Sequence, residues 1–224
     1  MADGKIYSSA VEALEDVFDG AVIMLGGFGV PGLPQELMKA LMELGPRELT
    51  FISNTCFEPK PDEYDVARLV ERGQVRKVIT TFFGRPNQEI PALELWRKGK
   101  LEVEVVPQGI LAERIRAAGA GLGGVYVPNY KDTVFEERDT RRFDGVEYVL
   151  ASPLGADFAL IGGYRADRLG NLTYRQAQRN YNPTMAAAAR VAVAEVREVV
   201  EVGEMDPERV VTPGIYVNRI VVGG

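Results

Sequence analysis

The chain has 224 residues, 46% of them hydrophobic and 26% charged, so it is composed like a soluble globular protein with one substantial core. Its net charge of −6 argues against a general nucleic-acid surface, because phosphate binding needs a basic patch. The absence of histidine excludes a Ser-His-Asp triad and a histidine-ligated metal, and we expect no metal site.

Cysteine usage and the N-terminal segment bear on the compartment. Cys56 is the one cysteine, so no internal disulfide can form and a reducing compartment is expected. We interpret Cys56 as a small, partly buried side chain, since the chain has no histidine to serve as its base. Residues 1–18 are acidic and amphipathic, unlike a signal peptide, and no apolar run approaches the ~20 residues that cross a bilayer. We therefore predict a cytoplasmic protein without membrane contact.

The first half of the chain alternates apolar runs with amphipathic segments, which is typical of a mainly parallel sheet covered by helices. Apolar runs predict buried strands at residues 21–25, 49–52 and 78–80. The alternation in "LEVEVV" predicts a further strand with Leu101, Val103 and Val105 on one face.

Helices are predicted between these strands from their caps and their apolar spacing. A capping box of Ser9 and Glu12 opens the first helix, whose apolar face carries Val11, Leu14 and Phe18. A second predicted helix starts at Pro34, has Leu37, Leu41 and Leu44 on its apolar face and stops at Gly45. A third covers residues 87–98, with Pro91 in its first turn and Gly99 at its end. A short fourth helix contains Leu111 and Ile115.

The second half has a different pattern. The dipeptide Asp144-Gly145 in "RRFDGVEYVL" favours a tight hairpin turn, and "PTMAAAARVA" at 183–192 predicts an alanine-rich helix. Further strands are predicted at residues 158–161, 196–202 and 216–222. The expected fold is an α/β protein, a single three-layer domain over residues 1–224, with a mainly parallel central sheet and a more antiparallel C-terminal part.

A glycine-rich stretch raises the question of nucleotide binding. Residues 27–32 read G-x-G-x-x-G after an apolar strand, as in a dinucleotide-binding loop. Pro31 removes a backbone N–H from that loop, and the next strand ends Ile52-Ser53-Asn54 without the acid that binds a ribose. Both observations argue against NAD.

The wider context resembles a different family. Asp19-Gly20, the apolar residues 23–25, Gly26-Gly27-Phe28, Gly32 and Pro34 match the α-subunit motif of family I coenzyme A transferases. Similar stretches run through the chain: "ISN" at 52–54, "VVPQGILAERIRAAGAG" at 105–121, "ADFALI" at 156–161, "ADRLGNLTYR" at 166–175, "RNYNP" at 179–183 and "VTPGIYVNRI" at 211–220.

This resemblance implies an enzyme that moves coenzyme A between an acyl-CoA and a small carboxylic acid, with coenzyme A as substrate and no cofactor. In the family the thioester is attacked by a glutamate that lies in a Ser-Glu-Asn-Gly stretch of the B subunit. This glutamate becomes a glutamyl-CoA thioester. No Ser-Glu dipeptide occurs in this chain, so no catalytic nucleophile is expected in it. The resemblance thus implies a separate B subunit in an A2B2 heterotetramer, the doubling being common in assemblies.

The resemblance also implies which residues of this half contact the substrate. Asn54 and Gln108 match the family's amides that bind the substrate's carboxyl groups, and neutral donors can stabilise oxygen that gains negative charge. Ordinary turn hydrogen bonding is the alternative for both. The active-site loop comprises Gly26, Gly27, Phe28, Gly29 and Gly32.

Three further side chains of these segments are interpreted separately from the substrate contacts. Phe28 either forms an apolar wall that excludes water or packs in the core. Asn180 and Asn182 of "RNYNP" are expected to shape backbone and are left out of the substrate contacts.

Two departures from the family leave the acyl substrate open. The chain reads Ser-Asn-Thr-Cys-Phe at 53–57 where relatives have Ser-Asn-Asn-Ala-Gly, and its 128–133 segment lacks their glycines. The preferred reaction is transfer from succinyl-CoA to a 3-oxoacid such as acetoacetate, with 3-oxoadipate, acetate or butyrate as alternatives. Two other classes stay open: a nucleotide-binding oxidoreductase domain and a catalytically empty scaffold.

Overall fold

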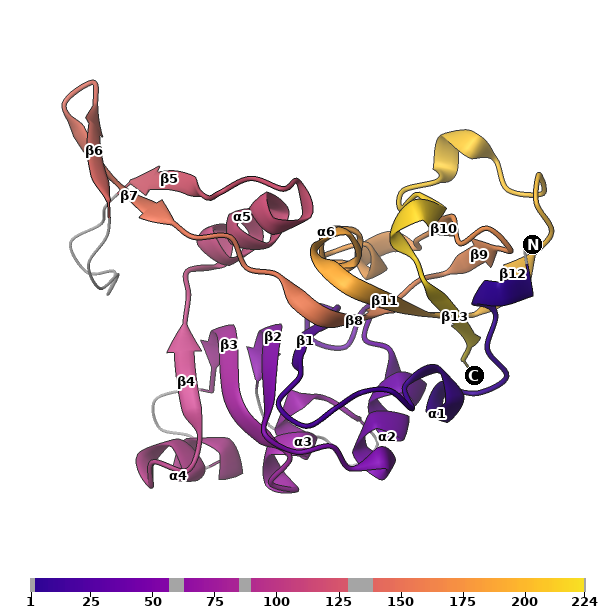
Figure 1. The fold of residues 1–224 in the computed structure, drawn as a ribbon, viewed down its shortest axis with the longest axis horizontal. Helices are drawn as coiled ribbons and strands as arrows, with labels where there is room; N and C mark the ends of the chain where they lie inside the picture. The colour runs from indigo at the N-terminus through magenta and orange to yellow at the C-terminus, as the bar shows by residue number, and fades with distance from the viewer. Residues whose placement is uncertain (1–2, 57–62, 85–89, 129–138, 224) are drawn as a thin grey trace.

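The computed structural model describes residues 3–56, 63–84, 90–128 and 139–223, and its largest element is a parallel sheet (Figure 1). All neighbouring strands of this seven-stranded sheet run parallel. In spatial order the strands are β13 (Arg219–Val222), β11 (Ala189–Val196), β8 (Ala156–Gly162), β1 (Val22–Leu25), β2 (Leu49–Cys56), β3 (Val75–Phe83) and β4 (Glu102–Val105).

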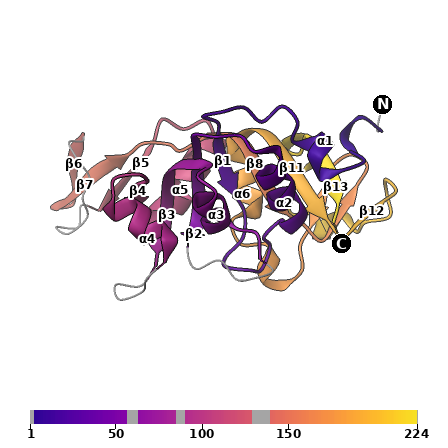
Figure 2. The same ribbon diagram turned by 90° about the horizontal axis from the view of Figure 1, so that it is seen from below.

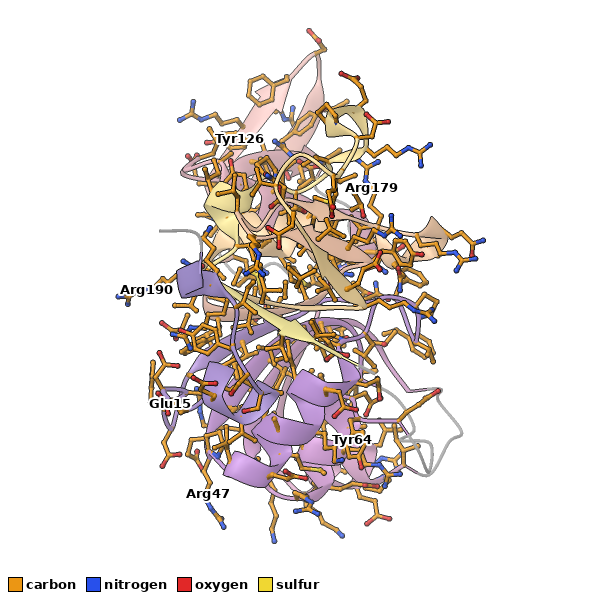
Figure 3. All side chains as sticks on the ribbon, turned by 90° about the vertical axis from the view of Figure 1, so that its right-hand side faces the viewer. Glu15, Arg47, Tyr64, Tyr126, Arg179 and Arg190 are labelled. Carbon is orange, nitrogen blue, oxygen red and sulfur yellow. The ribbon has the colours of Figure 1, made fainter. Side chains whose placement is uncertain are left out.

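Helices cover both faces of this sheet (Figure 1 and Figure 2). One face packs against α1 (Ala10–Ala13), α2 (Gln35–Leu44), α3 (Val66–Glu71) and α4 (Pro91–Arg97). The other face packs against α5 (Gln108–Gly119) and α6 (Asn182–Ala188). The predicted mixed α/β fold with a mainly parallel central sheet is confirmed. Charged side chains such as Glu15, Arg47 and Arg190 project from the surface (Figure 3).

Two smaller sheets lie between residues 125 and 200. Antiparallel strands β5 (Val125–Pro128), β7 (Val146–Ala151) and β6 (Thr140–Phe143) form one, with the predicted turn at Asp144 and Gly145, both at positive φ. The other contains β10 (Leu172–Thr173), β9 (Arg165–Asp167) and β12 (Glu198–Val200). Antiparallel pairing is therefore found in the second half, but the last strands, β11 and β13, return to the parallel sheet.

Short 3₁₀ turns connect some of these elements. They are η1 (Asp3–Lys5), η2 (Gln176–Gln178), η3 (Pro207–Arg209) and η4 (Gly214–Tyr216). The predicted strand at 216–222 thus begins later, at β13, and the one predicted at 196–202 is reduced to β12.

The first predicted helix is shorter than expected. Ser9 caps α1 by accepting a hydrogen bond from the Glu12 N–H at 3.1 Å, as predicted. The Glu12 carboxylate accepts from the N–H and hydroxyl of Ser8, so the reciprocal half of the capping box with Ser9 is not formed. α1 ends after Ala13, and the N–H of its C-cap Leu14 donates to the Val11 carbonyl.

Some apolar residues predicted on buried faces are exposed. The exposed side chains are Val11, Phe18, Leu44 and Val105. Phe18 lies beyond the end of α1, so helical spacing no longer places it with Leu14, while Val11 lies on the exposed side of the single turn. Val105 is 61% exposed because β4 is the edge strand of the sheet.

The alanine-rich segment changes conformation in its middle. α6 ends at Ala188, and the residues from Ala189 onward form β11, where Ala189 pairs with Ala156 of β8. The helix predicted to residue 192 was wrong in this second half, because pairing with β8 outweighs the helix propensity of alanine. The helix predicted from residue 87 is described from its N-cap Ile90 onward, and residues 87–89 lie outside the described part.

Candidate active site

The order of the strands creates a crevice at β1. From β1 the chain proceeds through β2, β3 and β4 on one side, while β8, β11 and β13 fill the other side. In open α/β sheets, ligands bind at the carboxyl ends of the strands where the strand order reverses. The turn of residues 26–32, called the glycine turn below, follows β1 directly and lies at this point.

The glycine turn has a backbone that requires glycine at several positions. Gly27, Gly29 and Gly32 have φ values of +113°, +64° and +78°, which L side chains rarely adopt. Gly26 has no room for a side chain, because a Cβ there would lie 1.7 Å from Oδ1 of Asn182. At these four positions of the predicted loop, the backbone conformation or the lack of space for a Cβ therefore requires glycine.

Side chains from the far end of the sequence hold this turn. Asn180 accepts from the Gly27 N–H at 3.1 Å and donates to the Pro31 carbonyl at 2.9 Å. Asn182 donates to the Gly32 carbonyl at 3.1 Å. The expectation that these asparagines shape backbone is confirmed.

The place of a dinucleotide pyrophosphate is already filled. α2 begins after its N-cap Pro34, and the Glu195 carboxylate from β11 accepts from the Leu37 N–H at 3.0 Å in the first turn. Burial raises the pKa of Glu195 to about 6, although backbone hydrogen bonds from Gln35, Glu36 and Leu37 lower it. A carboxylate at the helix N-terminus takes the position of the phosphates in a dinucleotide site, so the geometry argues against NAD.

Asn54 lies near the carboxyl end of β2 and is 3% exposed. Its Nδ2 donates to the Thr81 hydroxyl at 3.2 Å, while the hydroxyls of Thr80 and Thr81 donate to its backbone carbonyl at 3.0 and 2.8 Å. These bonds to β3 fix the plane of the amide at the edge of the crevice.

Gln108 is the first residue of α5 and is exposed. Its backbone carbonyl accepts from the Tyr181 hydroxyl at 3.4 Å. Burial raises the pKa of Tyr181, and a hydrogen bond from the Asn54 side chain opposes that rise, so Tyr181 connects both predicted amide residues. The sequence analysis missed Tyr181, although its position inside "RNYNP" between two predicted asparagines was a usable signal.

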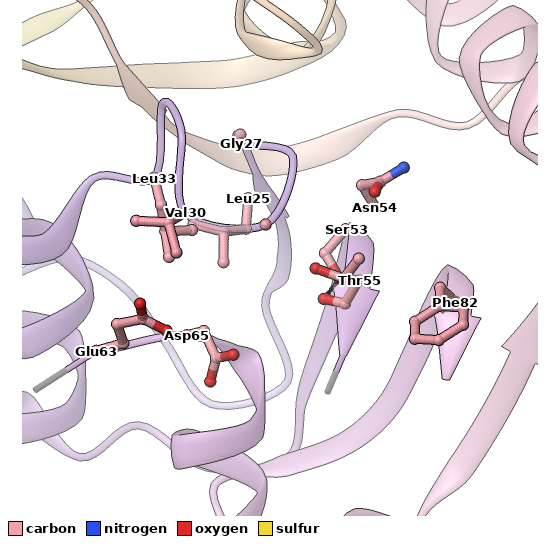
Figure 4. A pocket seen from close by; sticks show the side chains of 12 residues that line it. Leu25, Gly27, Val30, Leu33, Ser53, Asn54, Thr55, Glu63, Asp65 and Phe82 are labelled. Carbon is pink, nitrogen blue, oxygen red and sulfur yellow. Dashed lines mark hydrogen bonds between the residues drawn. The ribbon is translucent and has the colours of Figure 1, made fainter. Parts of the chain in front are cut away.

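A pocket of about 160 Å³ opens beside the glycine turn, with Asn54 at its rim (Figure 4). Neither Phe28 nor Gln108 is among its lining residues. The pocket is lined by Leu25, Gly26, Gly27, Gly29, Val30, Leu33, Ser53, Asn54, Thr55, Glu63, Asp65 and Phe82.

The charged groups described in this pocket are acidic. Asp65 caps α3, its carboxylate accepting from the Arg68 N–H at 3.2 Å, and burial raises its pKa. Glu63 lies beside it on the same wall (Figure 4). Asp65 is thereby committed to the start of α3.

Phe28 of the predicted site and Cys56, which was interpreted as a structural side chain, both have a clear placement. Phe28 is 51% exposed, so packing of its ring in the core is wrong, while its role as an apolar wall stays a prediction. Cys56 is buried, and burial raises the pKa of its thiol, which agrees with a structural side chain. Of the two departures from the family pattern, residues 57–62 and 129–133 lie outside the described part.

Across the described residues, no helix combines the length and the apolar character needed to cross a membrane.

The comparisons with known proteins agree with this geometry. The family model for coenzyme A transferase matches residues 7–223. The chain is 50% identical to the A subunit of 3-oxoadipate CoA-transferase from Pseudomonas putida, over 97% of this chain and 93% of the relative. It is 40% identical to the A subunit of the probable succinyl-CoA:3-ketoacid coenzyme A transferase from Bacillus subtilis (strain 168), over 98% of this chain and 90% of the relative.

A solved structure shares the fold. Glutaconate coenzyme A-transferase from Acidaminococcus fermentans superposes with a TM-score of 0.82 at 19% identity, over 98% of this chain and 75% of that one. The family model and the curated relatives lead to one conclusion: the chain belongs to the coenzyme A transferase family, and the two relatives named above are A subunits of such enzymes.

Proposed function

We propose that the chain is the A subunit of a 3-oxoacid CoA transferase, which transfers coenzyme A from succinyl-CoA to a 3-oxoacid such as acetoacetate. Support comes from a relative with 40% identity that is named for succinyl-CoA and 3-ketoacids. We expect the enzyme to work in the cytoplasm, with coenzyme A as substrate and no cofactor.

A separate B subunit completes the active site in this proposal. Relatives are named as A subunits, and this chain contains no Ser-Glu dipeptide that could carry the family's glutamate. The acid Asp65 in the pocket caps α3 and is therefore poorly placed to attack. We propose an A2B2 heterotetramer in which the B subunit supplies the nucleophile.

The proposed reaction proceeds in two half-reactions. The B-subunit carboxylate attacks the thioester carbonyl and releases the coenzyme A thiolate, which leaves an acyl–glutamyl anhydride. The thiolate then attacks the glutamyl carbonyl, which frees the first acid and leaves a glutamyl-CoA thioester. The acceptor acid reverses these steps, so atoms and charge balance at each stage.

This chain contributes neutral hydrogen-bond donors to those steps. Each attack places negative charge on an oxygen, and preorganised donors stabilise it. A substrate oxygen at the rim of the pocket joins the hydrogen-bond network of Asn54, Thr81 and Tyr181. Because the described donors of this network are uncharged, none of them forms an ion pair with the partner's carboxylate.

One observation carries the proposal. The glycine turn and Asn54 meet at one pocket, and Tyr181 connects Asn54 to the first turn of α5, where Gln108 lies. The groups that the family resemblance names thus converge on one edge of the sheet, although they are up to 82 residues apart in sequence.

A second substrate has its own support. The relative with 50% identity is the A subunit of a 3-oxoadipate CoA-transferase. Both substrates share the 3-oxo carboxylate, so they differ only in the tail that the pocket must accept.

The test is reconstitution with a B subunit from the same organism that carries the Ser-Glu-Asn-Gly stretch, followed by chromatography of acyl-CoA products. With succinyl-CoA as donor, acetoacetate and 3-oxoadipate are compared with acetate and butyrate. We expect the complex to form acetoacetyl-CoA and the isolated chain to be inert. Exchange by the isolated chain would contradict a nucleophile supplied by the partner, and acetate activity without 3-oxoacid activity would replace the substrate.

The amide residues are tested in the same complex. We expect Gln108→Ala and Asn54→Ala to lower kcat about 100- to 1,000-fold, as the loss of one transition-state donor does. Arg116→Ala, an exposed change on the same helix as Gln108, is the control. Unchanged kinetics of Gln108→Ala would favour a catalytically empty scaffold.

A further inference from the structure

We propose that Asn180 and Asn182 are positioning residues for coenzyme A transfer. Their side-chain amides hold the glycine turn in its working shape within this chain itself, before a partner or a substrate binds. This inference rests on the proposed function for its catalytic consequence, but not for its structural part.

Asn180 connects the two ends of the turn through one side chain. Its Oδ1 accepts from the Gly27 N–H at 3.1 Å, and its Nδ2 donates to the Pro31 carbonyl at 2.9 Å. A third bond, from Nδ2 to the Ala177 carbonyl at 2.7 Å, fixes the side chain to its own segment. Inside the turn, the Phe28 N–H donates to the Pro31 carbonyl at 3.2 Å. The Asn180 side chain therefore bridges Gly27 and Pro31, the two ends of the turn, from a separate segment of the chain.

Asn182 fastens the same turn to the sheet. Its side chain is fully buried, donates to the Gly32 carbonyl at 3.1 Å and accepts from the Gly162 N–H at 3.0 Å. Gly162 is the last residue of β8, the strand beside β1. A Cβ on Gly32 would lie 2.6 Å from Nδ2 of Asn182, so the glycine and the asparagine fill one shared space.

Anchoring matters here because of the composition of the turn. Glycine loses more conformational freedom on ordering than any other residue, so a glycine-rich turn keeps one shape only when other groups hold it. Asn180 supplies both a donor and an acceptor, which neither alanine nor aspartate can do. Both asparagines are also uncharged, which suits a site where a partner carboxylate must stay reactive.

The catalytic consequence follows from the precision that transfer needs. Reacting groups must be held near attack distance, and a misplacement of ~1 Å far from the chemistry can cost about 100-fold in rate. The glycine turn borders the pocket at Gly26, Gly27 and Gly29. Loosening it changes the wall against which the acyl group lies.

The experiment compares Asn180→Ala with Asn171→Ala in the reconstituted A–B complex. Asn171 also connects two segments through its amide, accepting from the Gly214 N–H at 2.9 Å and donating to Asp167 at 2.7 Å, and it is not a lining residue of the pocket. We expect Asn180→Ala to lower kcat about 10- to 100-fold with little change in KM for acyl-CoA. The Asn171→Ala complex should keep kcat within about twofold of wild type, since loops away from the chemistry do not position it. Equal kcat in the two variants would overturn the positioning role.

Hydrogen exchange supplies a readout that needs no activity. In the isolated full-length chain, NMR should show a slowly exchanging Gly27 amide, and exchange should become fast in Asn180→Ala. A Gly27 amide that exchanges fast in the wild-type chain would refute the preassembled turn. A wild-type complex that transfers no coenzyme A to any acid would refute the proposed function, and the exchange experiment would still decide whether Asn180 holds the turn.

Discussion

The buried Glu195 carboxylate gives a quantitative prediction about stability and pH. It accepts the Leu37 N–H at the start of α2, and burial together with the nearby charge of Glu36 raises its pKa from 4.5 to about 6. One pKa unit corresponds to 1.36 kcal/mol, so this group accounts for about 2 kcal/mol of pH-dependent stability.

The sign follows from proton binding. The folded chain binds the Glu195 proton more tightly than the unfolded chain, so this contribution to stability is fully present below pH 4.5 and is lost as pH rises through 6. Glu195→Gln carries no charge at any pH and removes the dependence. Wild type loses this stability as pH rises and the variant does not, so the free energy of unfolding of the variant, relative to wild type, should be about 2 kcal/mol higher at pH 7.5 than at pH 4.5.

Urea unfolding of both chains at the two pH values, followed by circular dichroism, measures this difference. Glu43→Gln, an exposed change on α2, the helix whose first turn Glu195 contacts, controls for loss of a carboxylate. Any constant cost of the glutamine cancels, because only the change between the two pH values is used. A difference below about 0.5 kcal/mol would contradict a raised pKa for Glu195.

Two further changes test the glycine turn and the tyrosine beside it. Gly32→Ala should lower Tm by about 4 to 8 °C, since its φ of +78° and its contact with Asn182 together cost ~2 kcal/mol. Gly73→Ala is the control: its φ is +69° and its Cβ would meet open space, so its Tm should fall less. Equal decreases in Tm, measured by calorimetry, would refute the contribution of the contact with Asn182. Tyr181→Phe should lower kcat of the A–B complex about fivefold, because one neutral hydrogen bond is worth ~1 kcal/mol. Tyr174→Phe also removes the hydroxyl of a largely buried tyrosine, whose pKa is raised to about 12, and should leave kcat unchanged. An equal decrease in kcat for Tyr174→Phe would mean that Tyr181 contributes to the stability of the fold and not to the reaction.

The strands of the first half were predictable because burial on both faces leaves a local signal. Continuous apolar runs marked β1, β2 and β3, and Asp144-Gly145 marked the hairpin between β6 and β7. The alanine-rich segment was not predictable, because the pairing of Ala189 with Ala156 depends on a strand 33 residues away. Local propensity cannot report such a partner.

The candidate site likewise has a part that was predicted from the sequence and a part that only the fold shows. The glycine turn and Asn54 were predicted because the motifs that resemble the family are local features of the sequence. The bonds of Asn180 to Gly27 and Pro31 join residues 153 and 149 positions apart, and only the fold shows that one side chain reaches both. Likewise the link from Tyr181 to the carbonyl of Gln108 spans 73 positions, so "RNYNP" could mark the tyrosine as a candidate but could not show which residue it contacts.

The burial of Cys56 bears on the fidelity of thioester chemistry. A thiol that reached an acyl-CoA as thiolate would capture the acyl group by transthioesterification and leave the protein acylated. This chain carries its one sulfhydryl two residues after Asn54, yet that side chain has no exposed surface, and burial opposes its ionisation. Under the proposed function, an acyl-CoA at the rim of the pocket thus meets no competing thiolate from this chain.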